Sequence, residues 1–444
     1  MTTSDYEIKI SPESHKLARW WVIFAVTIFT IASLYSTYLL LNSSNLIENT
    51  PLTQSIFTTN INLSTSIWFL SCIGGLWTIS TIHNIGKFDW LALFLTIIGA
   101  AVIAAMPFIS DDITILNKHI PIIKSDYFFI SLAIFASGII SAAFATLARF
   151  KTNQSSPILT KDISSILKMG IGYTSVIILI AMGCFFLAYE EIKLLEKDHA
   201  LNDAEYYNLF FWGGGHVLQY AYIQAMVIIW IIIAAASGIN LKINRGLLFF
   251  VFVTYTLSTI PAGYIYGTNE ITSYAHKNFF TTHIRYIGGV AVIIIGFFIL
   301  KDFLCSKSKG TKKTRHLRYA LIFSLFLTTI GIIINFTSYN LETTPPHNQS
   351  LIGGITLAMM GFIFYIMPKI GFAPIKSLLA SFTIITYASG EILKTISFIW
   401  AEILKASPLT DLTIIGNSLT IFAALIFLTT TYRSIFPKNR YSKY

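Results

Sequence analysis

Twelve apolar runs divide this chain, each close to the roughly 20 residues that a helix needs to cross the hydrocarbon core of a bilayer. The backbone finds no water partners in hydrocarbon, so a spanning segment must satisfy its own hydrogen bonds as a helix or belong to a closed barrel. These runs are much longer than barrel strands of about 10 residues. The sequence therefore predicts an all-α, polytopic transmembrane helix bundle of about 12 spans. The predicted spans lie at 18–41, 65–84, 89–109, 127–148, 170–189, 207–236, 245–266, 281–300, 318–336, 348–367, 376–403 and 411–432.

The composition excludes a soluble globular domain. Charged residues make up 12% of the chain and hydrophobic residues 54%, whereas soluble domains are about 25% charged. The net charge of +10 is better explained by basic loops on one membrane face than by nucleic-acid binding. The three cysteines form no CxxC motif, which argues against disulfides and thiolate metal sites.

The distribution of basic residues predicts the orientation. If the N-terminus is cytoplasmic, most Lys and Arg residues fall in inside segments, and the acidic loop 190–205 falls outside. We therefore expect both termini in the cytoplasm. The predicted organisation is a cytoplasmic tail at 1–17, a single transmembrane domain at 18–432 and a second cytoplasmic tail at 433–444.

Five of the nine histidines are most simply explained without a special role. His15, His199 and His316 lie in charged segments, where we expect solvated side chains. His83 and His119 are expected at the membrane interface.

The other four histidines lie at or near the predicted outer ends of spans: His216, His276, His283 and His347. Taken singly, each is best explained as a hydrogen-bonded histidine at a helix end. Imidazoles that converge from several helices at one depth would instead indicate a metal or haem centre in the bundle. The glycines at 213–215 would permit close approach by a neighbouring helix or a flat macrocycle.

Three segments together resemble the catalytic subunit of the haem–copper oxidase superfamily, which includes terminal oxidases and nitric oxide reductases. WGGGHVLQY at 212–220 resembles the sixth-helix motif, whose histidine binds copper. TTPPHNQSLIGGITLAMMGFIFYIMPKIGF at 343–372 resembles the tenth helix, which carries H-x-H. TNINLSTSIWFLSCIGGLWTI at 59–79 resembles the second helix, which opens with a haem-ligating histidine. The order and spacing of these segments extend the resemblance over roughly the whole chain.

The resemblance implies that the ligand of one haem is kept and that the ligands of the other are replaced. His347 matches the ligand of the high-spin, oxygen-reacting haem. Gln349 stands where the family has a ligand of the low-spin, electron-transferring haem, and Asn60 aligns with the other low-spin ligand. A carboxamide is a poor donor to haem iron compared with an imidazole. The resemblance thus implies one high-spin haem and a degenerate low-spin site.

The copper side is less complete. His216 matches the sixth-helix copper ligand, and Tyr220, one helical turn later, matches the tyrosine that some members cross-link to a copper ligand. The family's adjacent His-His pair is missing from the sequence, which leaves His283 as the candidate second ligand. With so few ligands, tight copper binding does not follow.

Glu391 and Lys394, three residues apart, are predicted to pair as a structural charge pair rather than a proton relay.

Three functions remain open. The resemblance implies a divergent subunit I-like oxidoreductase that passes respiratory electrons to oxygen or nitric oxide in the inner membrane of a bacterium. Its implied partners are lipid and other respiratory subunits or a cytochrome electron donor. The second function is that of a catalytically degenerate or accessory homologue, to which the loss of both low-spin ligands points. The third is that of a transporter without a redox role, which glycine-rich helix breaks would favour, although no internal repeat is visible.

Overall fold

The chain is helical over almost its whole described length. The computed structural model describes residues 12–80, 85–117, 120–152, 163–197, 200–306, 311–337, 345–404 and 409–437. The elements are α1 (Pro12–Ser43), α2 (Pro51–Asn62), the π-helical turn η2 (Leu63–Ile67), α3 (Trp68–Ser80), α4 (Lys87–Ile109), β1 (Thr114–Ile115), β2 (Ile122–Ile123), α5 (Asp126–Thr152), α6 (Ile163–Leu195), α7 (Asp203–Ala236), α8 (Arg245–Leu257), α9 (Pro261–Thr268), α10 (Tyr274–Ile287), α11 (Val290–Cys305), α12 (Arg315–Thr337), α13 (Pro345–Lys369), α14 (Ser377–Leu404) and α15 (Thr410–Ile435). The two short strands pair antiparallel.

The predicted all-α membrane bundle is confirmed. In the described ranges, 11 helices or joined helix pairs are long and apolar enough to cross a membrane. The twelfth predicted span corresponds to α14, which has 28 residues but carries Glu391 and Lys394 in its middle. Three spans are interrupted: Pro51–Ser80 by η2, Arg245–Thr268 before Pro261, and Tyr274–Cys305 at a glycine pair. A proline lacks the backbone N–H of a helix interior, which explains the second break.

One predicted boundary is wrong. The second span was expected to begin at residue 65, but its helix begins at Pro51. Residues 51–64 contain three threonines, two serines and two asparagines, so their hydropathy is too low to mark them as part of a span. Asn60 therefore lies inside a helix and not in front of one.

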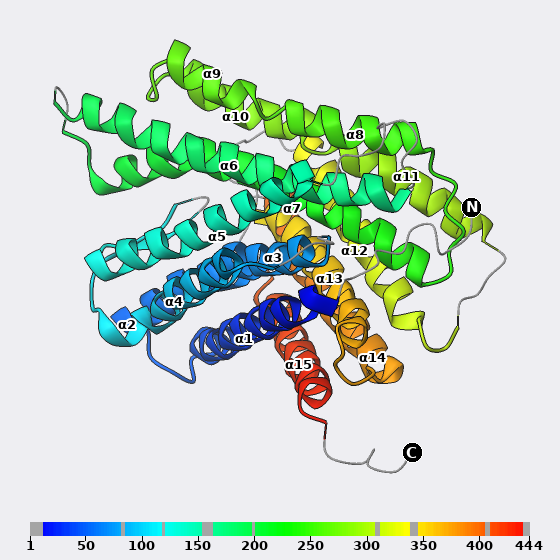
Figure 1. The fold of residues 1–444 in the computed structure, drawn as a ribbon. Coiled ribbons are helices and arrows are strands. Elements are labelled where there is room, and N and C mark those ends of the chain that lie inside the picture. Colours follow the sequence, from blue (N-terminus) through cyan, green and yellow to red (C-terminus); the bar gives the residue numbers. More distant parts are fainter. Residues whose placement is uncertain are drawn as a thin grey trace.

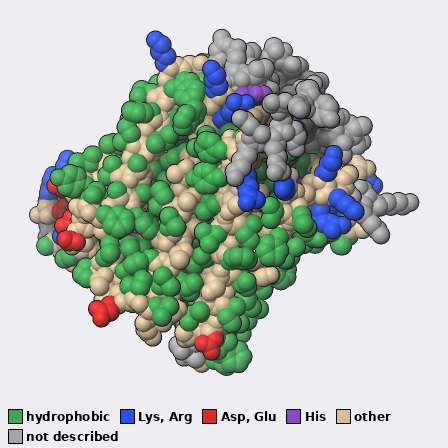
Figure 2. All heavy atoms as spheres, turned by 90° about the horizontal axis from the view of Figure 1, so that it is seen from below, with side chains coloured by type: hydrophobic (Ala, Val, Ile, Leu, Met, Phe, Trp, Pro, Cys, Tyr) green, Lys and Arg blue, Asp and Glu red, His purple; other side chains and the backbone are tan. Residues whose placement is uncertain are grey.

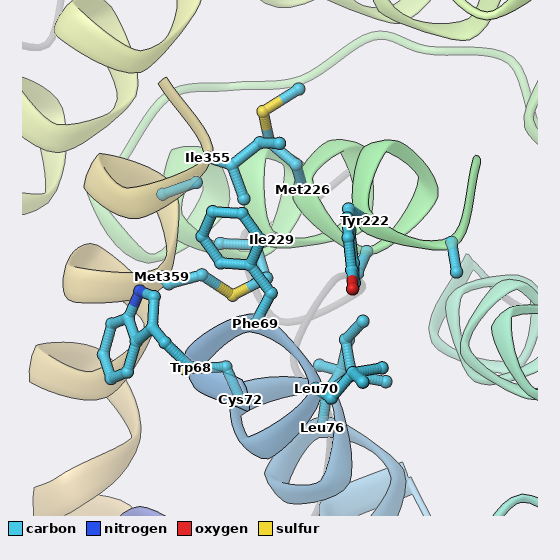
Figure 3. Close-up of a cluster of buried hydrophobic side chains, with 14 of the residues drawn as sticks. Trp68, Phe69, Leu70, Cys72, Leu76, Tyr222, Met226, Ile229, Ile355 and Met359 are labelled. Atoms are coloured by element: carbon cyan, nitrogen blue, oxygen red, sulfur yellow. The ribbon is translucent and has the colours of Figure 1, made fainter. Parts of the chain in front are cut away.

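Three spans form the centre of the bundle. The most apolar window is 94% buried in Asp203–Ala236, 83% in Pro51–Ser80 and 83% in His347–Lys369, against 50% or less in every other span identified. Figure 1 shows α3, α7 and α13 running through the middle, with α8–α11 along one edge and α1, α4 and α5 along another. Between α3, α7 and α13 lies a dense apolar cluster, which includes Phe69, Tyr222 and Met359 (Figure 3). These central spans are the segments that carry the three family-like motifs.

Both ends of the described chain lie at the same end of the bundle. Arg19, near the start of α1, donates from Nε to the carbonyl oxygen of Ile370. Three residues later, the amide of Ala373 donates to the carbonyl of Ser434 near the end of α15. Figure 2 shows basic side chains gathered toward this end, acidic side chains toward the other, and apolar side chains between them. The cytoplasmic placement of this end remains a prediction, and residues 1–11 and 438–444 of the predicted tails lie outside the described ranges.

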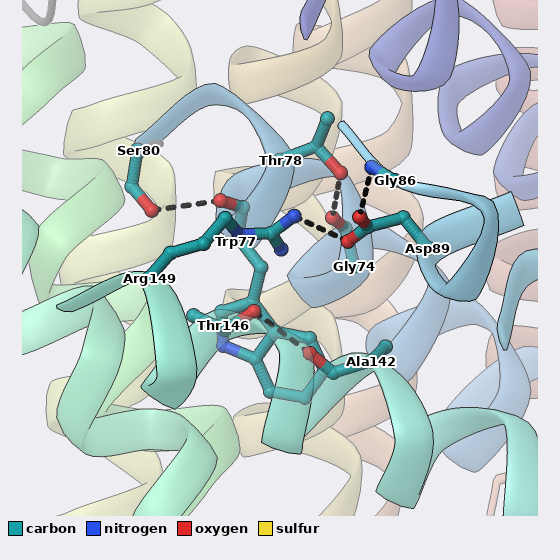
Figure 4. Close-up of polar contacts among 9 residues, drawn as sticks. All are labelled: Gly74, Trp77, Thr78, Ser80, Gly86, Asp89, Ala142, Thr146 and Arg149. Carbon is teal, nitrogen blue, oxygen red and sulfur yellow. Dashed lines mark hydrogen bonds and ion pairs between the residues drawn. The ribbon is translucent and has the colours of Figure 1, made fainter. Parts of the chain in front are cut away.

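A buried ion pair joins α4 to α5 at this basic end. Arg149 near the end of α5 donates from Nη1 to Asp89 in the first turn of α4, and Asp89 also accepts from the amide of Gly86 at 2.8 Å (Figure 4). Asp89 is only 8% exposed. A carboxylate this buried is tolerated because both a cation and a backbone amide bind it.

Removing the cation should therefore be costly. We expect Arg149→Met to lower the free energy of unfolding by up to roughly 3–5 kcal/mol, because it leaves the Asp89 carboxylate buried without its cation. Lys124→Met is the matched control: Lys124 pairs with Asp203 at 2.6 Å, but both side chains are about half exposed, so its loss should cost under about 1 kcal/mol. Unfolding of the purified protein in detergent measures both. Equal losses in the two variants would contradict this role for the buried pair.

Candidate functional site

His216 is held in place by its own helix. It lies on α7 at 8% exposure, with its ring beside those of Trp212 and Phe280 at centroid distances of 4.8 and 6.3 Å. Its Nδ1 lies 2.7 Å from the carbonyl oxygen of Trp212. A carbonyl only accepts hydrogen bonds, so Nδ1 carries the proton in this contact. This is the tautomer that metal-binding histidines commonly adopt.

Tyr220 and His283 are in direct contact. Tyr220 lies one turn after His216 on α7 and is 2% exposed. Its hydroxyl oxygen lies 2.6 Å from Nδ1 of His283 on α10 and 3.0 Å from the carbonyl oxygen of the same residue. The His283 ring stacks on Phe279 at a centroid distance of 5.1 Å. The structure thus joins two residues to which the sequence assigned separate roles.

The glycines before His216 receive side chains of neighbouring helices. A Cβ atom added at Gly213 would lie 2.3 Å from the Tyr266 hydroxyl, and one added at Gly214 would lie 2.4 Å from a ring carbon of Phe185. The contact partners at both positions are therefore aromatic side chains from α9 and α6. These glycines serve close helix packing, and the contacts give no support to the alternative of a flat macrocycle.

Tyr266 and His276 form a buried pair that the sequence did not reveal. Their rings lie 4.7 Å apart at 3% and 1% exposure. In the described part of the chain, neither the Tyr266 hydroxyl nor either ring nitrogen of His276 has a hydrogen-bond partner. Both rings also pack beside Phe280, as His216 does. Tyr266 was missed because no motif surrounds it, and only the fold shows that it lies next to a histidine.

These imidazoles do not form a complete metal centre. Among the described residues there is no group of three or more His, Cys, Asp or Glu side chains that could hold a metal ion. His283 instead contacts Tyr220, and His216 and His276 both pack beside Phe280. The donor set that copper would need is therefore not assembled in the described ranges.

His347 is anchored to a neighbouring helix. It lies in the first turns of α13, and its Nδ1 is 2.6 Å from the carbonyl oxygen of Gly331 on α12. As at His216, the carbonyl partner fixes the proton on Nδ1 in this contact. The ring is half-buried and its tautomer and orientation are set from outside α13.

Asn60 and Gln349, which the sequence predicts to stand at degenerate low-spin haem positions, line one cavity. Its volume is about 870 Å³. The Asn60 amide lies 3.2 Å from the Ser36 hydroxyl, and the Gln349 amide nitrogen donates to a carboxylate oxygen of Glu391. Both carboxamides are thus held in hydrogen bonds to protein groups. Carboxamides are in any case poor iron ligands, so these residues do not suit a low-spin haem.

The predicted pairing of Glu391 with Lys394 is confirmed. Lys394 Nζ lies 2.8 Å from Glu391 Oε1, and Glu391 is 2% exposed. Glu391 therefore accepts from Lys394 on one oxygen and from Gln349 on the other. The sequence did not reveal the third member, because Gln349 comes from another helix.

One expectation about the remaining histidines is wrong. His316 was expected to be solvated, but it is 6% exposed, with Nδ1 3.2 Å from the Ser377 hydroxyl. It lies in the first turn of α12 and packs against the ring of Phe364. Solvation was predicted because charged residues surround His316 in the sequence. His83, His119 and His199 lie outside the described residues.

Comparison with known proteins identifies the fold. No model of a known protein family matches the chain. An uncharacterised protein of Rickettsia prowazekii is 24% identical over 408 residues, covering 79% of this chain and 78% of that protein. An uncharacterised protein of Aquifex aeolicus is 22% identical over 203 residues, covering 43% of this chain and 48% of that protein. The cryo-EM structure of a heme-copper terminal oxidase dimer matches with a TM-score of 0.71 and 14% identity, over 96% of this chain and 84% of that one. The chain is therefore a multi-pass membrane protein with the fold of a heme-copper terminal oxidase.

The Tyr220 hydroxyl should matter for stability. Tyr220→Phe removes the hydroxyl, so Nδ1 and the carbonyl oxygen of His283 lose this partner. We therefore expect the free energy of unfolding to fall by about 1–3 kcal/mol. Tyr264→Phe is the control, because Tyr264 is 72% exposed and such surface changes stay within about 0.5 kcal/mol. Unfolding in detergent compares the two. The contact would prove unimportant if Tyr220→Phe matched its control.

Proposed function

We propose that this protein is a divergent relative of the haem–copper oxidases that binds a single haem through His347 and lacks the low-spin haem. The observation that carries the proposal is the bond from His347 Nδ1 to the Gly331 carbonyl at 2.6 Å. Histidines that ligate metals almost always donate their other ring N–H to such an acceptor, which fixes the ring and makes it a better ligand. The oxidase-like fold supports the same assignment.

The residues around the other proposed centres fit less well. Asn60 and Gln349 are hydrogen-bonded carboxamides, so the proposal includes no second haem. Copper held by His216 and His283 remains a prediction from the sequence. No three-ligand group occurs among the described residues, and no step in this proposal depends on copper.

When bound, the haem would supply a redox-active iron at which oxygen or nitric oxide is reduced. Tyr220 is the residue of this chain placed to handle a proton. Its hydroxyl oxygen contacts both Nδ1 and the carbonyl oxygen of His283, so a proton can be held at the phenol or shared with the imidazole. Burial at 2% exposure keeps bulk water away from this pair.

The proposal has consequences for partners and location. Without a low-spin haem, electrons must reach the site from another redox protein, such as a cytochrome or a respiratory subunit. Relatives in Rickettsia and Aquifex, together with the multi-pass fold, support the inner membrane of a bacterium as the location.

A second candidate is a homologue that keeps the fold without redox chemistry. It is favoured by the filled glycine surface of α7, where Tyr266 and Phe185 occupy the space next to Gly213 and Gly214. Oxygen uptake with a chemical reductant separates the two functions. Equal rates for the wild-type protein and His347→Ala would favour the redox-silent homologue.

Haem binding gives the direct test. We expect purified protein from haem-supplied membranes to show a haem absorbance. The His347→Ala variant should bind at least about tenfold less haem per chain, because even second-shell changes cost roughly 10–100-fold in metal affinity. Absorbance and extracted haem per chain measure this.

His316→Gln is the matched control. His316 is another buried, hydrogen-bonded histidine at the opposite end of α12 from Gly331, and its substitution should leave haem content unchanged. Wild-type protein without haem, or equal haem in wild type and His347→Ala, would refute the proposal.

A further inference from the structure

The cavity next to Asn60 and Gln349 extends into the bundle and is lined by both polar and apolar side chains. It begins at the end of the bundle opposite the chain termini, where Asn42, Ser43 and Gln54 line it, and reaches Thr356 on α13. Thr356 lies 11 residues into its helix, or roughly 16 Å at 1.5 Å per residue. Polar lining at this depth in a membrane protein is tolerated where it faces water or a ligand.

The lining carries one positive and one negative charge. More than half of the described lining residues have hydroxyl, amide or charged side chains, and among them Glu391 and Lys394 are the only Asp, Glu, Lys or Arg residues. Because these two neutralise each other at 2.8 Å, the cavity has no net charge. A ligand with a single charge would be attracted by one member of the pair and repelled by the other.

The chain makes specific room for both charged side chains. A Cβ atom at Gly353 on α13 would lie 3.0 Å from Cγ of Glu391, and one at Gly416 on α15 would lie 2.8 Å from Cγ of Lys394. Two helices thus carry glycine where a charged side chain of α14 crosses them. Lys394 then lies beside Asn417, another cavity-lining residue.

The pair still has unused hydrogen-bonding capacity. An ammonium has three N–H donors and a carboxylate accepts about four hydrogen bonds. The described contacts use one donor of Lys394 and three acceptor positions of Glu391, those filled by Lys394, Gln349 and Tyr387. Both side chains line the cavity, whose wall also carries apolar side chains such as Phe57 and Ile352.

We propose that this cavity binds a small zwitterion with an apolar body. The ligand's carboxylate would contact Lys394 and its ammonium would contact Glu391, while the apolar body packs against the hydrophobic part of the wall. The volume of about 870 Å³ lies within the range of roughly 300–1,000 Å³ typical of small-molecule sites. This inference does not depend on haem at His347, because His347 is not part of the lining.

Calorimetric titration of the purified chain in detergent tests the proposal with three related probes. L-Phenylalanine carries both charges, 3-phenylpropionate only the carboxylate and phenethylamine only the ammonium. We expect L-phenylalanine to bind at least about tenfold more tightly than either singly charged probe. Lys394→Gln and Glu391→Gln should each weaken its binding at least about tenfold, because each removes a desolvated charge contact.

Further variants keep the test decisive. The double variant Glu391→Gln/Lys394→Gln contains no unpaired buried charge, so it should fold even if a single variant does not, and it should also lose binding. Lys124→Gln/Asp203→Asn, which neutralises an exposed pair, and His347→Ala should both bind L-phenylalanine like the wild type. No measurable binding, equal affinity for all three probes, or unchanged affinity in the double variant would overturn the proposal.

Discussion

The hydrocarbon around this bundle offers no hydrogen-bond partners, so the backbone and most polar side chains inside it bind to other groups of the protein. That constraint explains the helical backbone and also the side-chain contacts at the centre. His216 and His347 both hydrogen-bond to backbone carbonyls, and Tyr220 binds across two helices to His283. Glu391 accepts from Gln349 and Lys394. The candidate site therefore consists of polar residues whose partners are set by the packing of α7, α10, α12, α13 and α14.

The same constraint decides what the sequence could predict about the fold. Lipid-facing helices must be apolar, so hydropathy located most spans to within a few residues of their observed ends. The helix Pro51–Ser80 was the exception. Its first part faces the polar cavity through residues such as Thr53 and Asn60 and therefore does not look like a span. Hydropathy records contact with lipid, and it fails where a membrane helix faces an internal polar space.

The candidate site was predictable only in part, for a related reason. Spacing along one helix gave the Glu391–Lys394 pair, since residues three apart share a helix face. It could not give the Tyr220–His283 contact or the bond from Gln349 to Glu391, which join different helices. Nor could it show that Tyr266 lies beside His276. Such contacts depend on how the helices rotate and cross, which one sequence does not specify.

The geometry of α13 separates the surroundings of His347 from those of Gln349. His347 and Gln349 are two residues apart, which separates their directions by about 200° around the helix axis. His347 accordingly contacts α12, whereas Gln349 contacts α14. A substitution on the α14 side alters the cavity and its ion pair but leaves the α12 contact of His347 intact. The opposite faces of α13 can therefore serve the two proposed functions separately, haem binding on one face and solute binding on the other, within the fold of a heme-copper terminal oxidase.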